Sequence, residues 1–431
     1  MRIAFYTLGC KVNQYETEIM TNQFANDGFD IVDIEDQADV YVINSCTVTS
    51  SGDKKTKQMI RRLKRVNPNA IVALTGCFPQ AFPDEASIIP EADVIQGSYN
   101  RSAIVKNVRK ALVTRERVVD ITPHTKGEQF EPMKASKFLE RTRAFVKIED
   151  GCDRYCSYCI IPKARGPIRS KSLEDIKSEV EALVANGYKE IVLVGINLSS
   201  YGKETKQHRL IDAIELVASI EGVKRIRLGS LEPELLTDDD LERMSKLEQF
   251  CDQFHLSLQS GSDETLERMN RHYNADEYYA IVKNIRDKFE NPSITTDIMV
   301  GFAGETEQEF EESVAFANKV KFAKAHVFAY SIREGTKAAT MPNQVDKKQK
   351  DNRSKLMIEA MNKLQQEFLQ SQLDKVQEVL FETPYGENQY VGYTKNYTKV
   401  VAKSDENLCG NIYQVKLVST EEEHCIGEII V

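Results

Sequence analysis

Three closely spaced cysteines constrain this chain more than any other feature. Cys152, Cys156 and Cys159 form a C-x3-C-x2-C pattern directly after residues 144–148, an apolar run that we interpret as a strand. Three thiolates on one short loop can hold three irons of a [4Fe-4S] cluster and leave the fourth iron without a protein ligand. The pattern therefore predicts an iron-sulfur site at the start of a domain.

An open iron allows chemistry that a fully ligated cluster does not. S-adenosylmethionine (SAM) can chelate the open iron through its amino and carboxylate groups, and an electron from the cluster then releases a 5′-deoxyadenosyl radical. The alternative is a structural zinc knuckle, but zinc usually takes four protein ligands, and no fourth Cys or His lies close by in the sequence. We therefore predict that Cys152, Cys156 and Cys159 are catalytic metal ligands.

A second set of cysteines is spread over the amino-terminal part of the chain. Cys10, Cys46 and Cys77 each follow a predicted strand. Because parallel strands present their carboxyl ends along one edge of a sheet, we expect these three side chains to converge. Each thiol taken alone could be an inert buried side chain, but three at strand ends favour a second three-cysteine cluster. The remaining cysteines are expected to be core thiols, namely Cys251, Cys409 and Cys425.

The alternation of strands and helices predicts an α/β fold in several domains. A chain of 431 residues is too long for one compact core. We predict an N-terminal parallel α/β cluster domain (residues 1–115), a polar linker (116–140), a (β/α)6 partial barrel (141–370) and a small all-β barrel (371–431). A long helix over residues 346–373 should close the partial barrel. The other predicted strands are residues 2–8, 40–44, 71–75, 191–194, 226–228, 255–258, 294–300 and 325–328.

Composition excludes some classes of protein. Hydrophobic residues make up 41% of the chain and charged residues 29%, with no apolar run long enough to span a bilayer and no secretory leader. Nine cysteines without an export signal indicate reduced thiols or metal ligands. We therefore expect a cytoplasmic protein with no membrane partner.

The charge balance does not point directly to a nucleic-acid partner. The net charge is −9, whereas phosphate contacts come from Lys and Arg. One segment, residues 50–65, has a local basic surplus that could face phosphates, although a solvated helix face would look the same. Its basic residues are Lys54, Lys55, Lys57, Arg61, Arg62, Lys64 and Arg65.

These motifs together resemble one known family. The opening Thr7-Leu8-Gly9-Cys10-Lys11-Val12-Asn13-Gln14-Tyr15-Glu16, with Asn44-Ser45-Cys46 and Thr75-Gly76-Cys77, is similar to the methylthiotransferases. It most resembles the branch that modifies N6-threonylcarbamoyladenosine at position 37 of tRNA. Tyr158, directly before Cys159, fits the radical SAM signature. The resemblance covers the whole chain and implies an N-terminal cluster domain, a radical SAM partial barrel and a C-terminal TRAM domain, which is a small OB-like barrel.

The resemblance also implies an activity, cofactors and partners. The expected reaction is radical methylthiolation of carbon 2 of N6-threonylcarbamoyladenosine-37 in tRNA. That carbon carries an unactivated C–H bond, so a radical is needed to abstract the hydrogen. The implied cofactors are two [4Fe-4S] clusters and SAM. The implied partners are the tRNA anticodon loop and a reductant protein such as a flavodoxin or ferredoxin, and we expect a monomer.

The family resemblance places the SAM contacts at the mouth of the barrel. Gly195 stands where backbone groups meet the methionyl amine, and Arg271 suits the methionyl carboxylate. Asp297 is expected to take the ribose hydroxyls, while Glu232 and Gln259 end adjacent strands at the same mouth. For each charged residue the alternative is an ordinary ion pair on a helix surface or between strands.

Two further segments resemble functional parts of the family. Arg165 and Arg169 follow the cysteine loop near the active site, and their partner is left open between SAM, phosphate and an acidic neighbour. TRAM domains bind RNA in related enzymes, and one strip here combines aromatic and basic side chains as RNA contact requires. Alternating residues on an exposed strand would look the same. The strip comprises Tyr393, Lys395, Tyr397, Lys399 and Lys403.

Other functions stay open at this point. The acceptor could be N6-isopentenyladenosine-37 of tRNA, or a ribosomal protein side chain as in another branch of the family. Lys11-Val12-Asn13 departs from the Pro-Lys-Asn type sequence of the latter branch, which counts against it. A reading from another class is an iron-sulfur RNA-binding protein without turnover, which reductive cleavage of SAM would exclude.

Overall fold

The amino-terminal domain is a six-stranded parallel sheet with helices on both faces. The computed structural model describes residues 1–134 and 142–430, and the strand order is β2-β1-β3-β4-β5-β6. One face packs against α1 and α5, and the other packs against α2. The strands are β1 (Arg2–Thr7), β2 (Asp30–Val32), β3 (Val40–Ser45), β4 (Ile71–Gly76), β5 (Val94–Gln96) and β6 (Val118–Asp120). The helices are α1 (Lys11–Asn26), α2 (Ser50–Val66), α3 (Cys77–Ala81), α4 (Pro83–Ser87) and α5 (Ile104–Thr114).

The sheet extends into the range that the sequence predicts as linker. β6 pairs in parallel with β5, through Val94 and Val118. β2, β5 and β6 have three residues each, which is too short for an alternation or an apolar run to stand out in the sequence. The end of the predicted linker and its boundary with the next domain fall on residues 135–141, outside the described residues.

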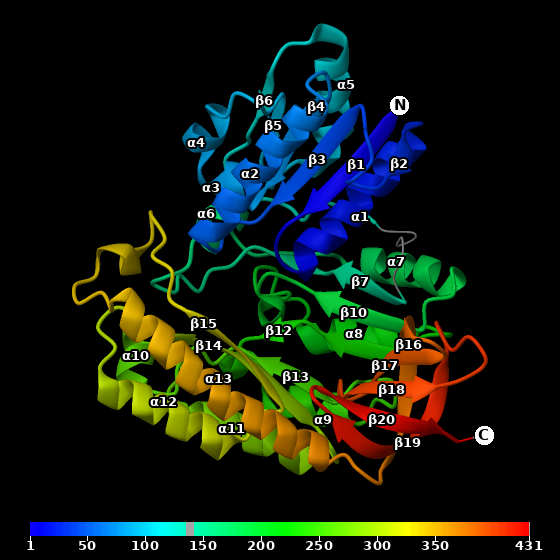
Figure 1. Cartoon of the computed structure of the whole chain (residues 1–431), viewed down its shortest axis with the longest axis vertical. Coiled ribbons are helices and arrows are strands. Elements are labelled where there is room, and N and C mark those ends of the chain that lie inside the picture. Colours follow the sequence, from blue (N-terminus) through cyan, green and yellow to red (C-terminus); the bar gives the residue numbers. More distant parts are fainter. Residues whose placement is uncertain (135–141, 431) are drawn as a thin grey trace.

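The central domain is a partial barrel of six parallel strand positions, in the middle of the molecule (Figure 1). Two sheets build it, with the orders β7-β10-β11 and β12-β13-β14-β15; β11 and β12 are consecutive and separated by Gly229. The predicted (β/α)6 partial barrel is therefore confirmed. The strands are β7 (Arg143–Lys147), β10 (Glu190–Val194), β11 (Arg225–Leu228), β12 (Ser230–Leu231), β13 (Gln253–Leu256), β14 (Ser293–Val300) and β15 (Lys324–Ala329), and a short hairpin pairs β8 (Glu149–Asp150) with β9 (Arg169–Ser170).

Helices cover the outside of the partial barrel, and their apolar faces share one core with its strands. The long predicted helix is α13 (Lys347–Gln370), which begins where the Asp346 side chain accepts a hydrogen bond from the Gln349 N–H at 2.9 Å. It runs along the outside of β14 and β15 beside α12 (Figure 1). The other helices are α6 (Ile161–Arg165), α7 (Leu173–Ala185), α8 (Leu210–Ala218), α9 (Asp238–Ser245), α10 (Asp263–Arg268), α11 (Ala275–Lys288) and α12 (Glu307–Val320).

The carboxyl-terminal domain is a small closed barrel, as the sequence predicts. Its strand order is β16-β17-β18-β20-β19, so the described strands leave no open edge. The strands are β16 (Val376–Gly386), β17 (Gln389–Thr394), β18 (Lys399–Lys403), β19 (Ile412–Glu421) and β20 (His424–Ile429). No helix within the described residues has the length and apolar character needed to cross a membrane.

The three cysteines predicted as core thiols do not all lie in a core. Cys251 and Cys425 are fully buried, but Cys409 is partly exposed, so the prediction is wrong for this residue. Cys409 lies in the turn between β18 and β19, next to Gly410, which has a φ of 78°. The turn places the Cys409 thiol near the surface, whereas cysteine as a residue type is usually buried.

Candidate functional site

The cysteines of the amino-terminal set all lie at one edge of the first sheet. Cys10 follows β1 and precedes α1, Cys46 follows β3, and Cys77 follows β4 as the first residue of α3. The strand order reverses between β1 and β3, and crevices at such a switch point are where open α/β sheets bind ligands. Burial raises the pKa of the Cys77 thiol to about 12, with smaller contributions from Cys46 and Cys10. The three cysteines therefore lie along one edge of the sheet, and their role as ligands of a second cluster stays a prediction.

Two glycines allow the backbone to bring these cysteines close. A Cβ atom on Gly9 would lie 3.0 Å from the Cβ of Cys46. Gly76 has a φ of 98°, and a Cβ there would lie 2.5 Å from the Ser45 carbonyl oxygen. Both Gly-Cys pairs are thus required by the close approach of neighbouring chain segments.

The second set lies on the loop between β8 and α6, and hydrogen-bond donors face its sulfur atoms. Arg271 Nη1 lies 3.3 Å from Cys156 Sγ, and the Ile161 N–H donates to Cys159 Sγ at 3.4 Å. Burial raises the pKa of Cys159 to about 12 and also raises that of Cys152. Donors directed at sulfur suit thiolates, which carry the negative charge of a cluster.

The thiols are not already arranged around a common ion. Within residues 1–134 and 142–430, no three Cys, His, Asp or Glu side chains are placed so as to hold a metal. Burial favours the neutral thiol, whereas a metal binds the thiolate and releases the proton. The donors directed at sulfur and the shared edge of the sheet fit a pair of clusters, with Cys10, Cys46 and Cys77 holding one and Cys152, Cys156 and Cys159 the other.

The two cysteine sets are physically connected. The short helices α3 and α6 pack together, with Cys77 and Ala81 against Ile160 and Ala164. Arg165, the last residue of α6, directs its Nε to Cys77 Sγ at 3.2 Å. A residue that follows the second cysteine loop thus contacts a cysteine of the first set.

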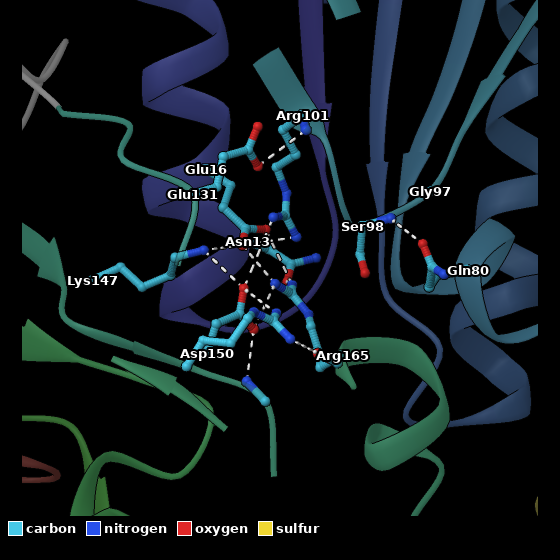
Figure 2. A network of polar contacts seen from close by, with 12 residues as sticks. Asn13, Glu16, Gln80, Gly97, Ser98, Arg101, Glu131, Lys147, Asp150 and Arg165 are labelled. Atoms are coloured by element: carbon cyan, nitrogen blue, oxygen red, sulfur yellow. Dashed lines mark hydrogen bonds and ion pairs between the residues drawn. The ribbon is translucent and has the colours of Figure 1, made fainter. Parts of the chain in front are cut away.

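Arg165 belongs to a buried network of charges between the two domains (Figure 2). Glu16 on α1 is fully buried. It accepts hydrogen bonds from Lys147, at 3.0 Å, and from Arg165, and it forms an ion pair with Arg101 Nη2 at 3.0 Å. Asp150 lies 3.0 Å from Lys147 and 3.6 Å from Arg165. Burial raises the pKa of Glu16, but Arg101, Arg165 and Lys147 outweigh it and lower the pKa to about 2. The network therefore holds an ionised carboxylate next to the first cysteine set.

The roles that the sequence leaves open for the two arginines now differ. Arg165 also donates to Asn13 Oδ1 at 2.7 Å, so its partners are a sulfur, an amide and two carboxylates. Arg169 donates to Glu128 and to the carbonyls of Arg165 and Pro167, at 2.9 to 3.0 Å. Of the alternatives considered, acidic neighbours account for both side chains.

The strand ends around the second set offer polar groups without partners. Gln259 has a φ of 70°, a backbone conformation that residues other than glycine rarely adopt. Its buried Oε1 has no hydrogen-bond partner among the described residues. Asn197 Oδ1 is similarly unpaired. A Cβ on Gly195 would lie 2.7 Å from Glu149 Oε2, so only glycine fits. Unpaired buried polar atoms beside a glycine suit a polar ligand such as SAM.

The other predicted SAM contacts pair with protein groups. Arg271 bonds to Glu232, at 3.3 Å between Nη1 and Oε1, and to the Ser257 carbonyl at 3.1 Å. Asp297 lies 3.4 Å from His255 Nε2, and the ring of Tyr158 packs edge-on against Phe302. Arg271 and Glu232 are thus brought together beside Cys156, whereas Asp297 faces the inside of the barrel. Their roles toward SAM stay predictions.

We expect Arg271→Lys to raise the KM for SAM about 10- to 100-fold, because one ammonium group cannot replace a guanidinium that bonds several partners at once. Steady-state SAM cleavage over a range of SAM concentrations measures this effect. Arg268→Lys is the matched control, since Arg268 pairs with Glu309 at 2.9 Å, and its KM should stay unchanged. Equal KM values in both variants would contradict a role of Arg271 toward SAM.

A cavity of about 850 Å³ connects all three domains. Its lining includes Cys10 and Lys11, the ends of barrel strands at Gly195 and Gly229, and Tyr397 of the C-terminal domain. The inner faces of β13, β14 and β15 form one wall. The volume falls in the range of sites that enclose small ligands, so the cavity can admit an acceptor group between the domains.

The strip predicted to contact RNA is largely an internal contact. Tyr393 and Tyr397 stack at 4.6 Å, and Arg143 lies 5.1 Å from the Tyr397 ring. Lys395 donates to the Glu248 carbonyl at 2.7 Å. Lys403, by contrast, is exposed. Most of the strip is therefore only partly exposed and contacts other parts of the chain, while its contact with RNA stays a prediction. An alternating strand looks the same in the sequence whether it faces water or another domain.

Sequence reasoning missed the charged residues that surround the site. Glu16 and Lys147 look like ordinary surface residues, and only partners far along the chain make them internal. His255 on β13 and His326 on β15, on either side of β14, line the cavity with ring centroids 6.3 Å apart. Their place on predicted barrel strands was the available signal.

Comparison with known proteins identifies the class. A profile of the Radical SAM superfamily matches residues 146–317, and one described as Uncharacterized protein family UPF0004 matches residues 2–97. A radical S-adenosylmethionine methyltransferase from Kitasatospora setae superposes with a TM-score of 0.56 at 13% identity, over 78% of this chain and 77% of that chain, which shows a shared fold. The fold and the cysteine loop thus define a radical SAM enzyme, which uses SAM and a [4Fe-4S] cluster.

Closer relatives identify the family. The chain is 38% identical to the threonylcarbamoyladenosine tRNA methylthiotransferase of Bacillus subtilis, over 99% of this chain and 96% of the relative. It is 36% identical to the protein of that name from Thermotoga maritima, over 98% and 95%. A tRNA-2-methylthio-N(6)-dimethylallyladenosine synthase from Alkaliphilus oremlandii is 33% identical, over 98% and 92%. The chain belongs to the tRNA methylthiotransferase family, in its threonylcarbamoyladenosine branch.

Proposed function

We propose that this enzyme places a methylthio group on carbon 2 of N6-threonylcarbamoyladenosine at position 37 of tRNA, in the cytoplasm. The observation that supports this most directly is the joining of two three-cysteine sets by Arg165 and the α3–α6 contact. When bound, the two [4Fe-4S] clusters and SAM supply the radical that removes hydrogen and the site from which sulfur is delivered. A flavodoxin or ferredoxin would supply electrons to a monomeric enzyme.

The chain's own residues position these groups and exclude water. Arg271 and Asn197 lie at the sulfur atoms of Cys156 and Cys152, at 3.3 and 3.8 Å, and would hold the charge of that cysteine loop. Arg165 would do the same at Cys77. The C-terminal barrel lines one side of the cavity with Tyr393 and Tyr397. We therefore propose that the acceptor adenosine is enclosed between the three domains.

The decisive experiment uses the reconstituted enzyme with SAM, a reductant and tRNA from a strain that lacks this gene. Mass spectrometry of the digested nucleosides should show the 2-methylthio derivative of N6-threonylcarbamoyladenosine, formed in proportion to enzyme. tRNA that carries unmodified adenosine-37 is the control acceptor. The proposal fails if the threonylcarbamoyl nucleoside is recovered unchanged while the enzyme cleaves SAM.

A further inference from the structure

The cavity between the domains contains a cation without an acidic partner. Lys11 follows Cys10 and lines the cavity. Among the described residues, its ammonium group forms no ion pair and no side-chain hydrogen bond. Arg143 and Arg227 repel the ammonium group, Glu190 and Cys10 partly offset them, and Lys11 acts in turn on His326 of β15. Lys11 is exposed to the cavity, and the described residues place no acidic side chain within 4.0 Å of its ammonium group. The charge can therefore bind an anionic group that enters the cavity.

Apart from Lys399, which lies over the Tyr385 ring, the other charged side chains discussed around the cavity have ionic partners. Lys324 lies 3.1 Å from Glu423, and Asp297 lies 3.4 Å from His255. The two arginines that act on Lys11 are also paired. Arg143 lies 2.7 Å from Glu382, and Arg227 lies 2.7 Å from Glu190. The acidic side chains near Lys11 therefore have other cations as partners. The unpaired charge of Lys11 favours an anionic ligand.

The wall of the same cavity that β13, β14 and β15 form is polar. His255, Asp297 and His326 come from three adjacent strands, with Asp297 and His326 in register. Thr295 Oγ1 lies 3.0 Å from His255 Nδ1. A group that can both accept and donate hydrogen bonds would satisfy such a wall, whereas a purely apolar group would leave its polar atoms unpaired.

We propose that Lys11 binds the carboxylate of the N6 substituent of the acceptor adenosine, with His326 as a neighbouring hydrogen-bond donor. This inference rests on the proposed function, because a threonylcarbamoyl group ends in a carboxylate and a hydroxyl. Lys11 is thereby a specificity residue. A dimethylallyl substituent offers no charge to Lys11 and would bury its ammonium group without a partner.

The test compares the affinity of two tRNAs for the reconstituted enzyme in the absence of SAM. The tRNAs have one sequence and differ only in bearing N6-threonylcarbamoyladenosine or adenosine at position 37. Fluorescence anisotropy gives both Kd values. For the native enzyme we expect the modified tRNA to bind more tightly. Lys11→Gln should weaken its binding about 10- to 100-fold, the effect of losing a hydrogen bond to a charged group, and leave the unmodified tRNA unaffected.

Two further variants separate this role from a structural one. Lys11→Arg keeps the charge and should restore most of the preference. Lys399→Gln is the matched control: Lys399 lines the same cavity, but its Nζ lies over the Tyr385 ring, 5.2 Å from the centroid. It should leave the ratio of the two Kd values unchanged. Iron content near eight per chain in each variant shows that the neighbouring Cys10 still holds its cluster.

The outcomes distinguish the inference from the proposed function. If the native enzyme methylthiolates the modified tRNA but Lys11→Gln retains the native ratio of Kd values, the inference is overturned and the function stands. Equal weakening toward both tRNAs would also overturn it, since Lys11 would then contact phosphates that the two tRNAs share. Failure of the native enzyme to modify the tRNA would instead refute the proposed function.

Discussion

Replacing Cys156 with alanine is expected to abolish reductive cleavage of SAM and to lower the iron content from about eight to about four per chain, because two thiolates do not retain a three-thiolate cluster. Cys156 lies on the loop whose sulfur atoms face Arg271 and Ile161. Release of 5′-deoxyadenosine and colorimetric iron assays measure both effects on anaerobically prepared protein. The amino-terminal cysteine set should keep its iron.

Cys409→Ala is the control for this experiment. Cys409 is a partly exposed thiol in a turn of the C-terminal barrel, so its removal should change neither the iron content nor SAM cleavage. If Cys156→Ala cleaves SAM at the native rate, the C-x3-C-x2-C loop is not the radical-generating site. That result would remove the basis of the proposed reaction.

Arg165→Met is expected to lower the apparent free energy of unfolding by about 3–5 kcal/mol, the cost of leaving a buried charge without its partner. Arg165 is fully buried and contacts Glu16, Asp150 and Cys77. Its loss leaves the two carboxylates with fewer cations and Cys77 without a donor. Urea unfolding followed by circular dichroism gives the stability, and the EPR spectrum of the reduced protein reports on the amino-terminal cluster.

The matched variant is Arg62→Met, which removes an arginine that pairs with Glu35 on the surface of α2. Exposed pairs contribute about 1 kcal/mol or less, so this variant should unfold almost as the native protein does. Comparable stability of the two variants would show that the buried network is not required. Arg165→Lys should recover part of the stability, because it retains the charge without the several-partner geometry of a guanidinium.

The sequence predicts the fold where strands are long and apolar. All six residues of β3 and of β4 are buried, and such continuous apolar runs are typical of parallel sheets covered on both faces. The three-residue strands β2, β5 and β6 carry too few residues for a pattern. β13 begins at Gln253, two residues before the predicted start. The prediction missed this start because Gln253 is polar, although it pairs with Ser293 inside the barrel.

The candidate site divides in the same way. The six cysteines could be proposed as ligands because their spacing and their position after strands are local features. Glu16 could not, because a glutamate on an amphipathic helix looks solvated until Arg101, Lys147 and Arg165 arrive from distant segments. Tyr393 and Tyr397 likewise show no sign in the sequence of their contact with Arg143 of the central domain. Contacts between domains depend on docking, which leaves no local pattern.

Helix α1 belongs to two cores at once, which affects how the chain folds during synthesis. Met20 and Phe24 pack in the core of the amino-terminal sheet, whereas Val12, Tyr15 and Ile19 pack in the core of the central domain. The first domain leaves the ribosome before β7 and α7 are synthesised, so one side of α1 stays exposed to solvent until then. The nascent amino-terminal half therefore exposes an apolar surface. We expect chaperones to bind this surface until the central domain has been synthesised and packs against it.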